Sequence, residues 1–377
     1  MAGTRASIVL GTAALCAALL VLLAGCTPDS PGLSTEDPAT SEPVTPAGRP
    51  EVLATGLEAP WSILRLPAGS VGEGSTLISE RDTAVVSQLT PDGDLHQIGI
   101  IAGVHPGGEG GLLGLAVDDA GENLYAYLTA ASDNRIVRMP LTSTGDSLAL
   151  GVEEVVLDGL AKARNHDGGR IAFGPDGMLY ATVGDAGDTS RAQDLSSLNG
   201  KILRMTPDGA VPGDNPFPAS LVYSYGHRNP QGIAWDDSGQ LYAAEFGQDT
   251  WDEFNRIEAG GNYGWPTVEG KGGGGDFIDP LIQWATDDAS PSGLTYLRGT
   301  FFLAALKGEQ VYAIYVREDG TADSVGWFPG EHGRIRDVAP GPDDTLWLIT
   351  NNTDGRGDPA ADDDKLIQYR VSGMVEG

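Results

Sequence analysis

The hexapeptide Asn165-His166-Asp167-Gly168-Gly169-Arg170 is the segment whose residue types point most directly to chemistry. It runs into residues 171–185, which read as a strand, a turn and a second strand that ends on the carboxylate Asp185. A loop histidine next to a rigid strand, with a carboxylate within reach, is a common arrangement for a general base. An isolated Asn-His pair more often only closes a turn, so the interpretation of His166 as a base depends on the motifs that accompany it.

Two further segments combine charged residues with glycine. In residues 221–232, Arg228 and Asn229 precede a proline that favours extended backbone, and both side chains suit a polyanionic cofactor. Residues 245–253 and 260–266 bring carboxylates and glycine-exposed carbonyls into one loop system. Hard oxygen ligands of this kind suit calcium, but the spacing is not that of an EF-hand, so a solvated acidic loop remains an alternative.

A repeated pattern predicts the elements that must position these residues. A small apolar residue, a Pro/Asp/Gly turn and an aromatic-bearing strand recur at 116–125, 172–180, 234–242 and 339–347. The last gap has room for two units, and residues 61–89 and 294–316 supply plausible units without the full signature. Turn chemistry of this kind between alternating apolar runs marks β-hairpins. We therefore predict an all-β fold, a six-bladed β-propeller of four-stranded antiparallel blades, in preference to a β-sandwich or a β-helix.

The N-terminal region reads as an export and anchoring segment. Residues 1–25 resemble a bacterial lipoprotein signal peptide, and Leu23-Ala24-Gly25-Cys26 resembles a lipobox, which predicts lipidation of Cys26. An uncleaved membrane anchor is the alternative, although the apolar run is short for one. Residues 26–50 are rich in Ser, Thr, Pro and Glu and read as a disordered tether, so residues 51–377 form the predicted catalytic domain.

Composition limits the partners. The net charge of −30 and the isoelectric point near 4.2 argue against nucleic acid and against an anionic membrane surface as partners. Membrane attachment is therefore expected only through the lipid anchor, on the outer face of the cell membrane. Cys16 and Cys26 are the only cysteines, and both fall in or at the end of the signal segment, so no disulfide is expected inside the exported domain.

Five segments of the chain resemble those of a known family. Residues 165–185, 198–205, 223–232, 245–266 and 334–338 are similar to those of the soluble pyrroloquinoline-quinone (PQQ) dependent sugar dehydrogenases, which include glucose and aldose sugar dehydrogenases. The segments Gly-His-Arg-Asn-Pro-Gln-Gly and Gly-Gly-Asn-Tyr-Gly-Trp-Pro are the specific ones. The resemblance implies PQQ and Ca²⁺ as cofactors, an aldose sugar as substrate and a soluble or membrane electron acceptor.

The resemblance also implies roles for individual residues. His166 matches the family's general base, Asp185 the carboxylate that orients it, and Arg228 the cation at the reactive quinone oxygen. The residues implied to bind the cofactor are Asn229, Lys307, Arg334 and Arg336, together with Arg228. Those implied to bind calcium are Gly247 and Gln248 beside the quinone, and Glu253 and Tyr263 at a second, structural ion.

Several positions depart from the family's pattern. Glu109 stands where the glucose enzyme carries a glutamine near cofactor and sugar, and Asn165 stands on the substrate side where that enzyme carries an aspartate. Gln193 is the candidate for another cofactor-side glutamine. Glycines around residues 272–275 replace a further structural-calcium ligand. Substrate preference and the second calcium are therefore less constrained than the His, Asp and Arg core.

The leading hypothesis is oxidation of aldoses at C1 to lactones by His-assisted hydride transfer to the quinone. One alternative is a cofactor-free propeller lipoprotein that binds glycans or proteins. Another is a calcium-dependent hydrolase of the lactonase type. Convergence of Lys307, Arg334 and Arg336 would favour the quinoprotein, because a hydrolase of neutral lactones has no need of three clustered cations.

Overall fold

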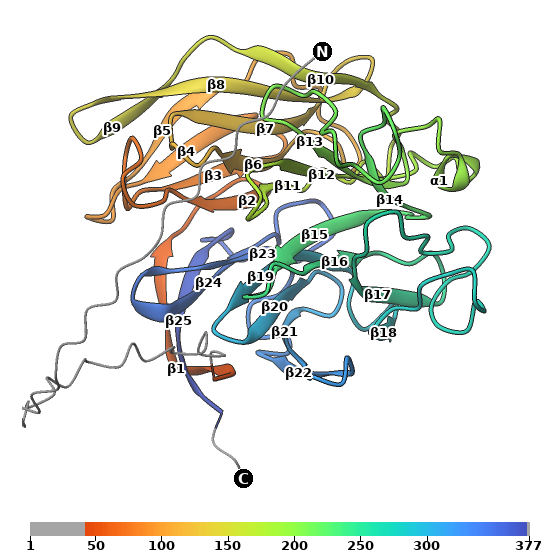
Figure 1. The fold of residues 1–377 in the computed structure, drawn as a ribbon. Helices are drawn as coiled ribbons and strands as arrows, with labels where there is room; N and C mark the ends of the chain where they lie inside the picture. Colours follow the sequence, from red (N-terminus) through yellow and green to blue (C-terminus); the bar gives the residue numbers. More distant parts are fainter. Residues whose placement is uncertain (1–41, 375–377) are drawn as a thin grey trace, which may run out of the picture. The chain divides into compact units, whose positions relative to one another are not determined.

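The computed structural model describes residues 42–374, in which six antiparallel sheets account for nearly all regular structure (Figure 1). Each sheet contains a path of four strands, which confirms the predicted six-bladed propeller. The described helices are the short α1 (Ser190–Gln193) and a 3₁₀ turn at Pro342–Asp344. Among the described residues, no helix has the length and apolar character needed to span a membrane.

Five blades follow one another along the chain. Their strands are β2 (Pro60–Arg65), β3 (Thr76–Glu80), β4 (Val85–Leu89) and β5 (Leu95–Ile100); β6 (Leu112–Val117), β7 (Asn123–Thr129), β8 (Asn134–Thr144) and β10 (Glu154–Leu160); β11 (Ile171–Phe173), β12 (Leu179–Val183), β13 (Lys201–Met205) and β14 (Val222–Tyr225); β15 (Pro230–Trp235), β16 (Leu241–Glu245), β17 (Trp251–Arg256) and β18 (Ile282–Ala285); and β19 (Pro291–Leu297), β20 (Thr300–Ala305), β21 (Gln310–Val316) and β22 (Ala322–Trp327). The second of these blades also carries β9 (Ser147–Leu150), which pairs with β8.

The sixth blade closes the ring by pairing the two ends of the described chain. It consists of β23 (Ile335–Pro340), β24 (Thr345–Thr350), β25 (Leu366–Gly373) and, outermost, β1 (Val44–Ala54). The predicted tether boundary at residue 50 is therefore wrong, because residues 44–50 belong to this blade. An outermost strand makes ladder hydrogen bonds on one side only, so it tolerates Pro46 and a register shift between Ala47 and Glu51. The predicted signal segment and the predicted lipidation site, Cys26, lie outside the described residues.

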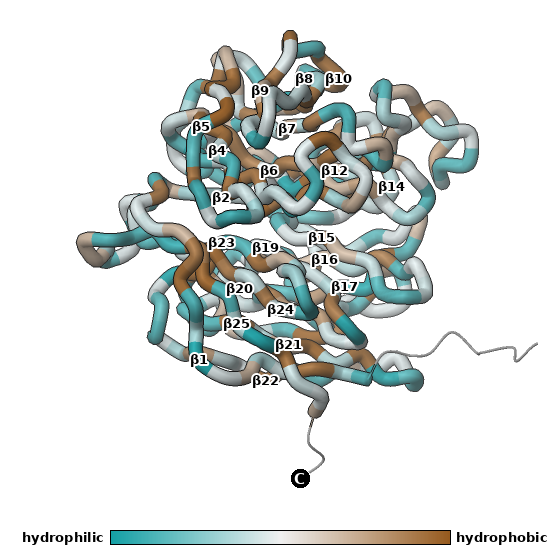
Figure 2. The backbone as a smooth tube through the Cα atoms, turned by 90° about the vertical axis from the view of Figure 1, so that its left-hand side faces the viewer, coloured by the Kyte–Doolittle hydropathy of each residue, from teal (hydrophilic) through white to brown (hydrophobic). Residues whose placement is uncertain are grey.

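The repeated sequence pattern is the first hairpin of a blade. In each of the four full repeats the small residue lies directly opposite the aromatic one on the neighbouring strand. The pairs are Ala116 with Tyr125, Ala172 with Tyr180, Ala234 with Tyr242, and Ala339 with Trp347. The small side chain leaves room for the ring across the strand pair, which explains why the two recur together. Figure 2 shows the apolar stretches following the strands and the hydrophilic ones lying mostly in the connecting loops.

The first strand of each blade faces the propeller axis. The strands β2, β6, β11, β15, β19 and β23 lie around the middle of the ring, and two cavities lie at or near these strands. One cavity is lined by residues at or before the starts of these strands and by the loops that follow β16, β20 and β24, and the other mainly by residues further along the inner strands. The ring of inner strands therefore gathers side chains from all six blades at two opposite ends.

Candidate active site

The cavity at the strand starts has a volume of about 410 Å³ and holds most of the predicted site residues. Its lining residues from the prediction are Glu109, Asn165, His166, Arg228, Asn229, Gly247, Lys307, Arg334 and Arg336. These residues come from loops and strand ends spread over about 230 positions of the chain, and the propeller topology brings them together.

His166 and Asp185 form a buried pair at one wall of this cavity. His166 precedes β11 with a left-handed φ of +61°, and its Nδ1 lies 2.7 Å from Oδ1 of Asp185, which follows β12 and is fully buried. The other oxygen of Asp185 accepts a hydrogen bond from Nε1 of Trp265 at 2.9 Å. Burial opposes ionisation of Asp185, but the hydrogen bonds from His166, Trp265 and Gly187 outweigh it and lower its pKa. An ionised carboxylate only accepts, so Nδ1 must donate and Nε2 is left as the basic nitrogen.

Glu109 reaches the cavity from a glycine-rich loop ahead of β6. Gly108 has a φ of +66°, and a Cβ at that position would come within 1.9 Å of the carbonyl oxygen of Arg164, so the loop requires glycine. Oε2 of Glu109 accepts the backbone N–H of His166 at 2.9 Å and Nδ2 of Asn229 at 3.2 Å. The carboxylate therefore holds the backbone of the histidine and the neighbouring amide in place.

Arg228 and Asn229 lie at the entry to β15, where Glu245 at the end of β16 anchors them. The Glu245 carboxylate accepts the backbone N–H groups of both residues. The guanidinium of Arg228 donates to Oε1 of Gln248 at 2.6 and 3.0 Å and lies 5.6 Å from the ring centroid of Trp265. Burial lowers the pKa of Arg228 from its ordinary value. These hydrogen bonds go only to neutral groups, so the charge of the guanidinium is not neutralised and can stabilise a negative charge in the cavity.

The three cationic side chains that were expected to lie close together are found at the same cavity. Lys307, Arg334 and Arg336 all line the cavity. Lys307 is more than half exposed and pairs with Asp287. Arg334 donates to Asp354 at 3.0 Å, while its buried Nε has no hydrogen-bond partner among the described residues. Arg336 is held only by neutral amide and hydroxyl groups, and burial lowers its pKa to about 9.

These residues fit a ligand with several carboxylates. The lining contains five basic side chains, namely Arg228, Lys307, Arg334, Arg336 and Arg356, against the single carboxylate Glu109. The chain as a whole carries a net charge of −30, so the local excess of cations is a reversal of its overall character. The buried Nε–H of Arg334 has no acceptor among the described residues, which costs free energy. A bound anion could accept this hydrogen bond. The volume lies within the ~300–1,000 Å³ that small-molecule and cofactor sites occupy.

Two carboxylates, Glu269 and Asp252, shape the loop after β16. Oε1 of Glu269 accepts four consecutive backbone N–H groups of residues 248–251, at 2.6 to 3.1 Å. Asp252 accepts the N–H of Gly247 at 2.8 Å, and a Cβ at Gly247 would lie 1.9 Å from the carbonyl oxygen of Trp251. Among residues 42–374, no group of three or more His, Cys, Asp or Glu side chains is arranged to hold a metal. A calcium ion at Gly247 and Gln248 would therefore depend on main-chain carbonyls.

Glu253 and Tyr263 lie behind this loop and not in the cavity. Both border a small void of about 10 Å³. Oε1 of Glu253 accepts the N–H of Gly270 at 2.8 Å, and burial raises the pKa of Glu253 to about 7. The hydroxyl of Tyr263 donates to the Arg256 carbonyl at 2.7 Å, and its ring stacks on His227 at 4.7 Å. The structure brings the two residues together, and the second calcium stays a prediction.

Gln193, a predicted cofactor-binding residue, does not line the cavity. Its amide, at the end of α1, exchanges hydrogen bonds of 2.9 Å with Asn262 and donates to the carbonyl of Trp265 at 2.8 Å. Its polar atoms therefore brace the loop that carries Trp265, and its contact with the cofactor stays a prediction. Gln193 supports Asp185 only indirectly, through Trp265.

The cavity also contains residues that the sequence did not single out for a role. They are Trp61, Gln231, Phe246, Ser290, Leu306 and Arg356. Gln231 belongs to the motif around Arg228, so its position could have been anticipated. Arg356 lies in the loop between β24 and β25, where only the tertiary structure places it at the site.

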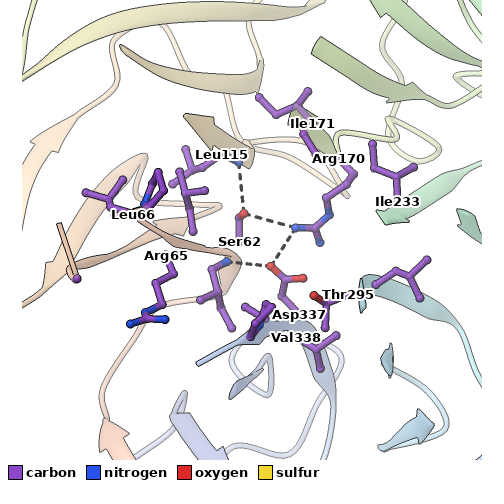
Figure 3. Close-up of a pocket in the computed structure, with 18 of the residues that line it drawn as sticks. Ser62, Arg65, Leu66, Leu115, Arg170, Ile171, Ile233, Thr295, Asp337 and Val338 are labelled. Carbon is purple, nitrogen blue, oxygen red and sulfur yellow. Dashed lines mark hydrogen bonds and ion pairs between the residues drawn. The ribbon is translucent and has the colours of Figure 1, made fainter. Parts of the chain in front are cut away.

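The second cavity lies further along the inner strands and has a volume of about 520 Å³. Its floor is an ionic network in which Nη1 of Arg170 donates to Asp337 at 2.9 Å and to the hydroxyl of Ser62 at 3.4 Å (Figure 3). The ring of Trp61 lies over the same guanidinium at 4.3 Å and faces the first cavity. This layer separates the two cavities, and the second contains no histidine.

The match to known proteins agrees with this geometry. The sequence model of the Glucose / Sorbosone dehydrogenase family matches residues 57–361. The chain belongs to this family. The PQQ-bound aldose sugar dehydrogenase from Streptomyces coelicolor has a similar structure, with a TM-score of 0.81 and 49% identity, covering 87% of this chain and 100% of that one.

Two curated members of the glucose/sorbosone dehydrogenase family are similar over shorter stretches. An aldose sugar dehydrogenase of Escherichia coli is 33% identical over 51% of this chain and 58% of its own length. Quinoprotein glucose dehydrogenase B of Acinetobacter calcoaceticus is 31% identical over 58% of this chain and 52% of its own length. The chain thus spans little more than half of these two relatives.

Proposed function

We propose that this protein oxidises aldose sugars at C1 to lactones with PQQ as its redox cofactor. The observation that carries the proposal is the convergence of Lys307, Arg334 and Arg336 in the same cavity as the His166–Asp185 pair. PQQ, when bound, supplies an ortho-quinone that accepts a hydride. Membership of the sugar dehydrogenase family and the PQQ-bound structural relative support the choice of cofactor and reaction.

The residues of this chain divide the work between proton transfer and charge stabilisation. Nε2 of His166 takes the proton of the anomeric hydroxyl, and Asp185 stabilises the imidazolium that results. Arg228, which lines the same cavity, would stabilise negative charge on the oxygen of the hydride acceptor. The cations and Asn229 would bind the carboxylates of the cofactor, and Glu109 and Asn165, which line the same cavity, would border the substrate.

Calcium is part of the proposal at two places. The carbonyl oxygens of Gly247 and Gln248 would hold an ion beside the cofactor, where it acts as a Lewis acid. Glu253 and Tyr263 would contribute to a second, structural ion. The rigid loop that Glu269 organises and the absence of space for a side chain at Gly247 support the first site.

We also propose where the protein works. The features of residues 1–25 and Cys26 support export and lipid anchoring on the outer face of the membrane. Electrons would pass from the reduced cofactor to a soluble or membrane acceptor. The strongly acidic surface supports a site of action away from nucleic acid.

A substitution of His166 tests the central claim. The protein is reconstituted with PQQ and calcium, and sugar-dependent bleaching of a dye is followed alongside the absorbance of the bound quinone. His166→Gln should still bind PQQ but oxidise aldoses ~10²–10⁴-fold more slowly, the loss typical of a missing general base. His96→Gln, which lies outside the cavity against Ser147, is the matched control.

The same assay separates the alternatives. A lactonase would hydrolyse lactones without PQQ, and a glycan-binding propeller would bind sugars without reducing the quinone. Near wild-type sugar oxidation by His166→Gln would remove His166 from the mechanism, whereas loss of PQQ binding would place it in the cofactor's shell.

A further inference from the structure

One cation of the cavity is not used by the proposed cofactor assignment. Arg356 lies in the loop between β24 and β25, with 49% of its side chain exposed, and its Nη2 is 4.0 Å from Oε1 of Glu109. Glu109 comes from the blade that begins with β6, so the two residues meet across the cavity. At this distance and exposure the pair is loose, and both charges remain available to a ligand.

Hydrogen bonds connect both Glu109 and Arg356 to residues with a proposed role. Oε2 of Glu109 holds the backbone N–H of His166 and the amide of Asn229, which leaves Oε1 toward Arg356. Asp354 accepts the backbone N–H of Arg356 at 2.8 Å on one oxygen and Nη2 of Arg334 at 3.0 Å on the other. The Asp354 side chain is fully buried. The carboxylate of Glu109 and the backbone of Arg356 are therefore held next to His166 and Arg334, while the Arg356 guanidinium itself is only loosely paired.

We infer that Glu109 and Arg356 form a charge-compensated pair that makes the substrate side of the cavity select neutral sugars over charged ones. The inference rests on the proposed function. The three cofactor cations would be engaged by carboxylates and Arg228 by the quinone oxygen. Asp185 lies behind the ring of His166 and does not line the cavity, so the charges left in the lining near the base are those of Glu109 and Arg356. A sugar whose anomeric hydroxyl reaches His166 lies beside the residue that holds the His166 backbone, and a charge on that sugar meets one member of the pair.

Removing either charge should shift the selectivity in opposite directions. Glu109→Gln keeps an oxygen that can accept from His166 and Asn229, but it leaves Arg356 uncompensated and should favour an anionic sugar. Arg356→Gln leaves Glu109 uncompensated and should favour a cationic sugar. Each shift should be about 3- to 10-fold, as expected for one partly exposed charge at close range. The double variant should return close to the wild-type selectivity.

The test compares kcat/KM for glucose, glucuronate and protonated glucosamine at low ionic strength. The Glu109→Gln variant should raise the ratio of glucuronate to glucose, and Arg356→Gln should raise the ratio of glucosamine to glucose. Both shifts should shrink as salt is added. Asp344→Asn and Arg298→Gln are controls that make the same changes in net charge, because this exposed pair, 3.3 Å apart, lines neither cavity.

A binding measurement keeps this inference separate from the proposed function. Methyl glucoside and methyl glucuronide have no free anomeric hydroxyl and cannot be oxidised at C1, so calorimetric titration of the PQQ-loaded protein reports binding alone. If the wild type oxidises no sugar, the proposed function fails, while the order of the two glycosides in each variant still tests the pair. Unchanged ratios in the single variants, shifts in the same direction for both, or equal shifts in the controls would overturn the inference.

Discussion

At the scale of single residues, the candidate site depends on one histidine whose chemistry is set by its neighbours. His166 occupies a left-handed backbone conformation that residues other than glycine adopt rarely, and Glu109 and Asp185 hold its backbone and ring from two sides. Because Asp185 also accepts from Trp265, the carboxylate is fixed in orientation before any substrate arrives. The ring is thereby kept in the tautomer that leaves Nε2 free to act as a base.

Asp185→Asn tests this arrangement. The amide can present its NH₂ group to Nδ1 and favour the wrong tautomer, so sugar oxidation should fall by ~10²–10⁴-fold while PQQ binding persists. The lowered pKa of Asp185 means that its carboxylate stabilises the fold above the ordinary value of 3.8 and loses that effect as the pH falls through the lowered pKa. The difference in Tm between wild type and variant should therefore shrink on acidification, as measured by calorimetry from about pH 3 to 7.

Asp188→Asn is the control for this experiment, since that carboxylate is exposed three residues further along. A variant at Asp185 with wild-type turnover, or a Tm difference that grows on acidification, would contradict the assigned role.

At the scale of elements, the loops at the starts of the inner strands carry the site and are held by buried or half-buried carboxylates. Glu245 anchors the entry to β15, Glu269 the loop after β16, and Asp354 the loop after β24. Each carboxylate accepts backbone N–H groups that have no partner in the sheet. Burial opposes ionisation of Glu269, but the N–H groups of residues 248–251 lower its pKa.

Calcium removal should act through the loop that Glu269 organises. Exhaustive chelation should lower both the affinity for PQQ and the Tm, because an ion bound only by the native state stabilises it by mass action. Glu269→Ala should weaken PQQ binding even at saturating calcium and cost about 1.5–3 kcal/mol of stability, the usual contribution of hydrogen bonds to a charged group. Absorbance titrations with PQQ and thermal melts check both effects.

Asp276→Ala, an exposed carboxylate in the same loop system, serves as the control. Full PQQ affinity after chelation would argue against calcium beside the cofactor.

At the scale of the whole molecule, contacts across the axis and between the chain ends hold the ring together. Arg170, Asp337 and Ser62 come from three different blades and meet in one buried network (Figure 3). Burial raises the pKa of Asp337 even though Arg170 lies beside it. The same network lies beneath Trp61, so it forms the floor under the candidate active site.

Breaking this buried pair on one side should be more harmful than removing it altogether. Arg170→Met or Asp337→Leu alone should lower the free energy of unfolding by about 3–5 kcal/mol, because each leaves a buried charge without its partner. The double variant should recover most of the loss, as measured by denaturant unfolding. Additive losses in the double variant would show that the two residues act independently.

The outermost strand β1 should contribute measurably to stability. The N–H of Val44 donates to the hydroxyl of Thr300 at 2.9 Å, that hydroxyl donates back to the Val44 carbonyl at 3.0 Å, and Val44 is fully buried. A chain that begins at Glu51 should therefore melt at a lower temperature than one that begins at Glu42, since burial of a valine alone contributes ~1.5–3 kcal/mol. Equal melting temperatures would place residues 42–50 outside the stable domain.

The sequence by itself determined the fold class and many of the residues that line the candidate site. The small-to-aromatic repeat encodes the first hairpin of a blade. Because the paired residues are close in sequence, this pattern can be recognised without information on distant contacts. The segments around His166 and Arg228 carried enough residue types in fixed order to predict a base, its carboxylate and a cofactor cation. Eight further predicted residues proved to line the cavity beside His166.

Only the tertiary structure decided which residues share the cavity and where the domain begins. Gln193 was placed at the cofactor by its type, yet its amide is used by Asn262 and Trp265, and no local pattern encodes such a partner. Arg356 enters the site because the last blade closes the ring beside the loop of Glu109. Residues 44–50 resemble a tether in composition, but pairing with β25 at the other end of the described chain makes them a strand. Contacts between residues distant in sequence have no signature in either segment alone, because each segment contributes only half of the interaction.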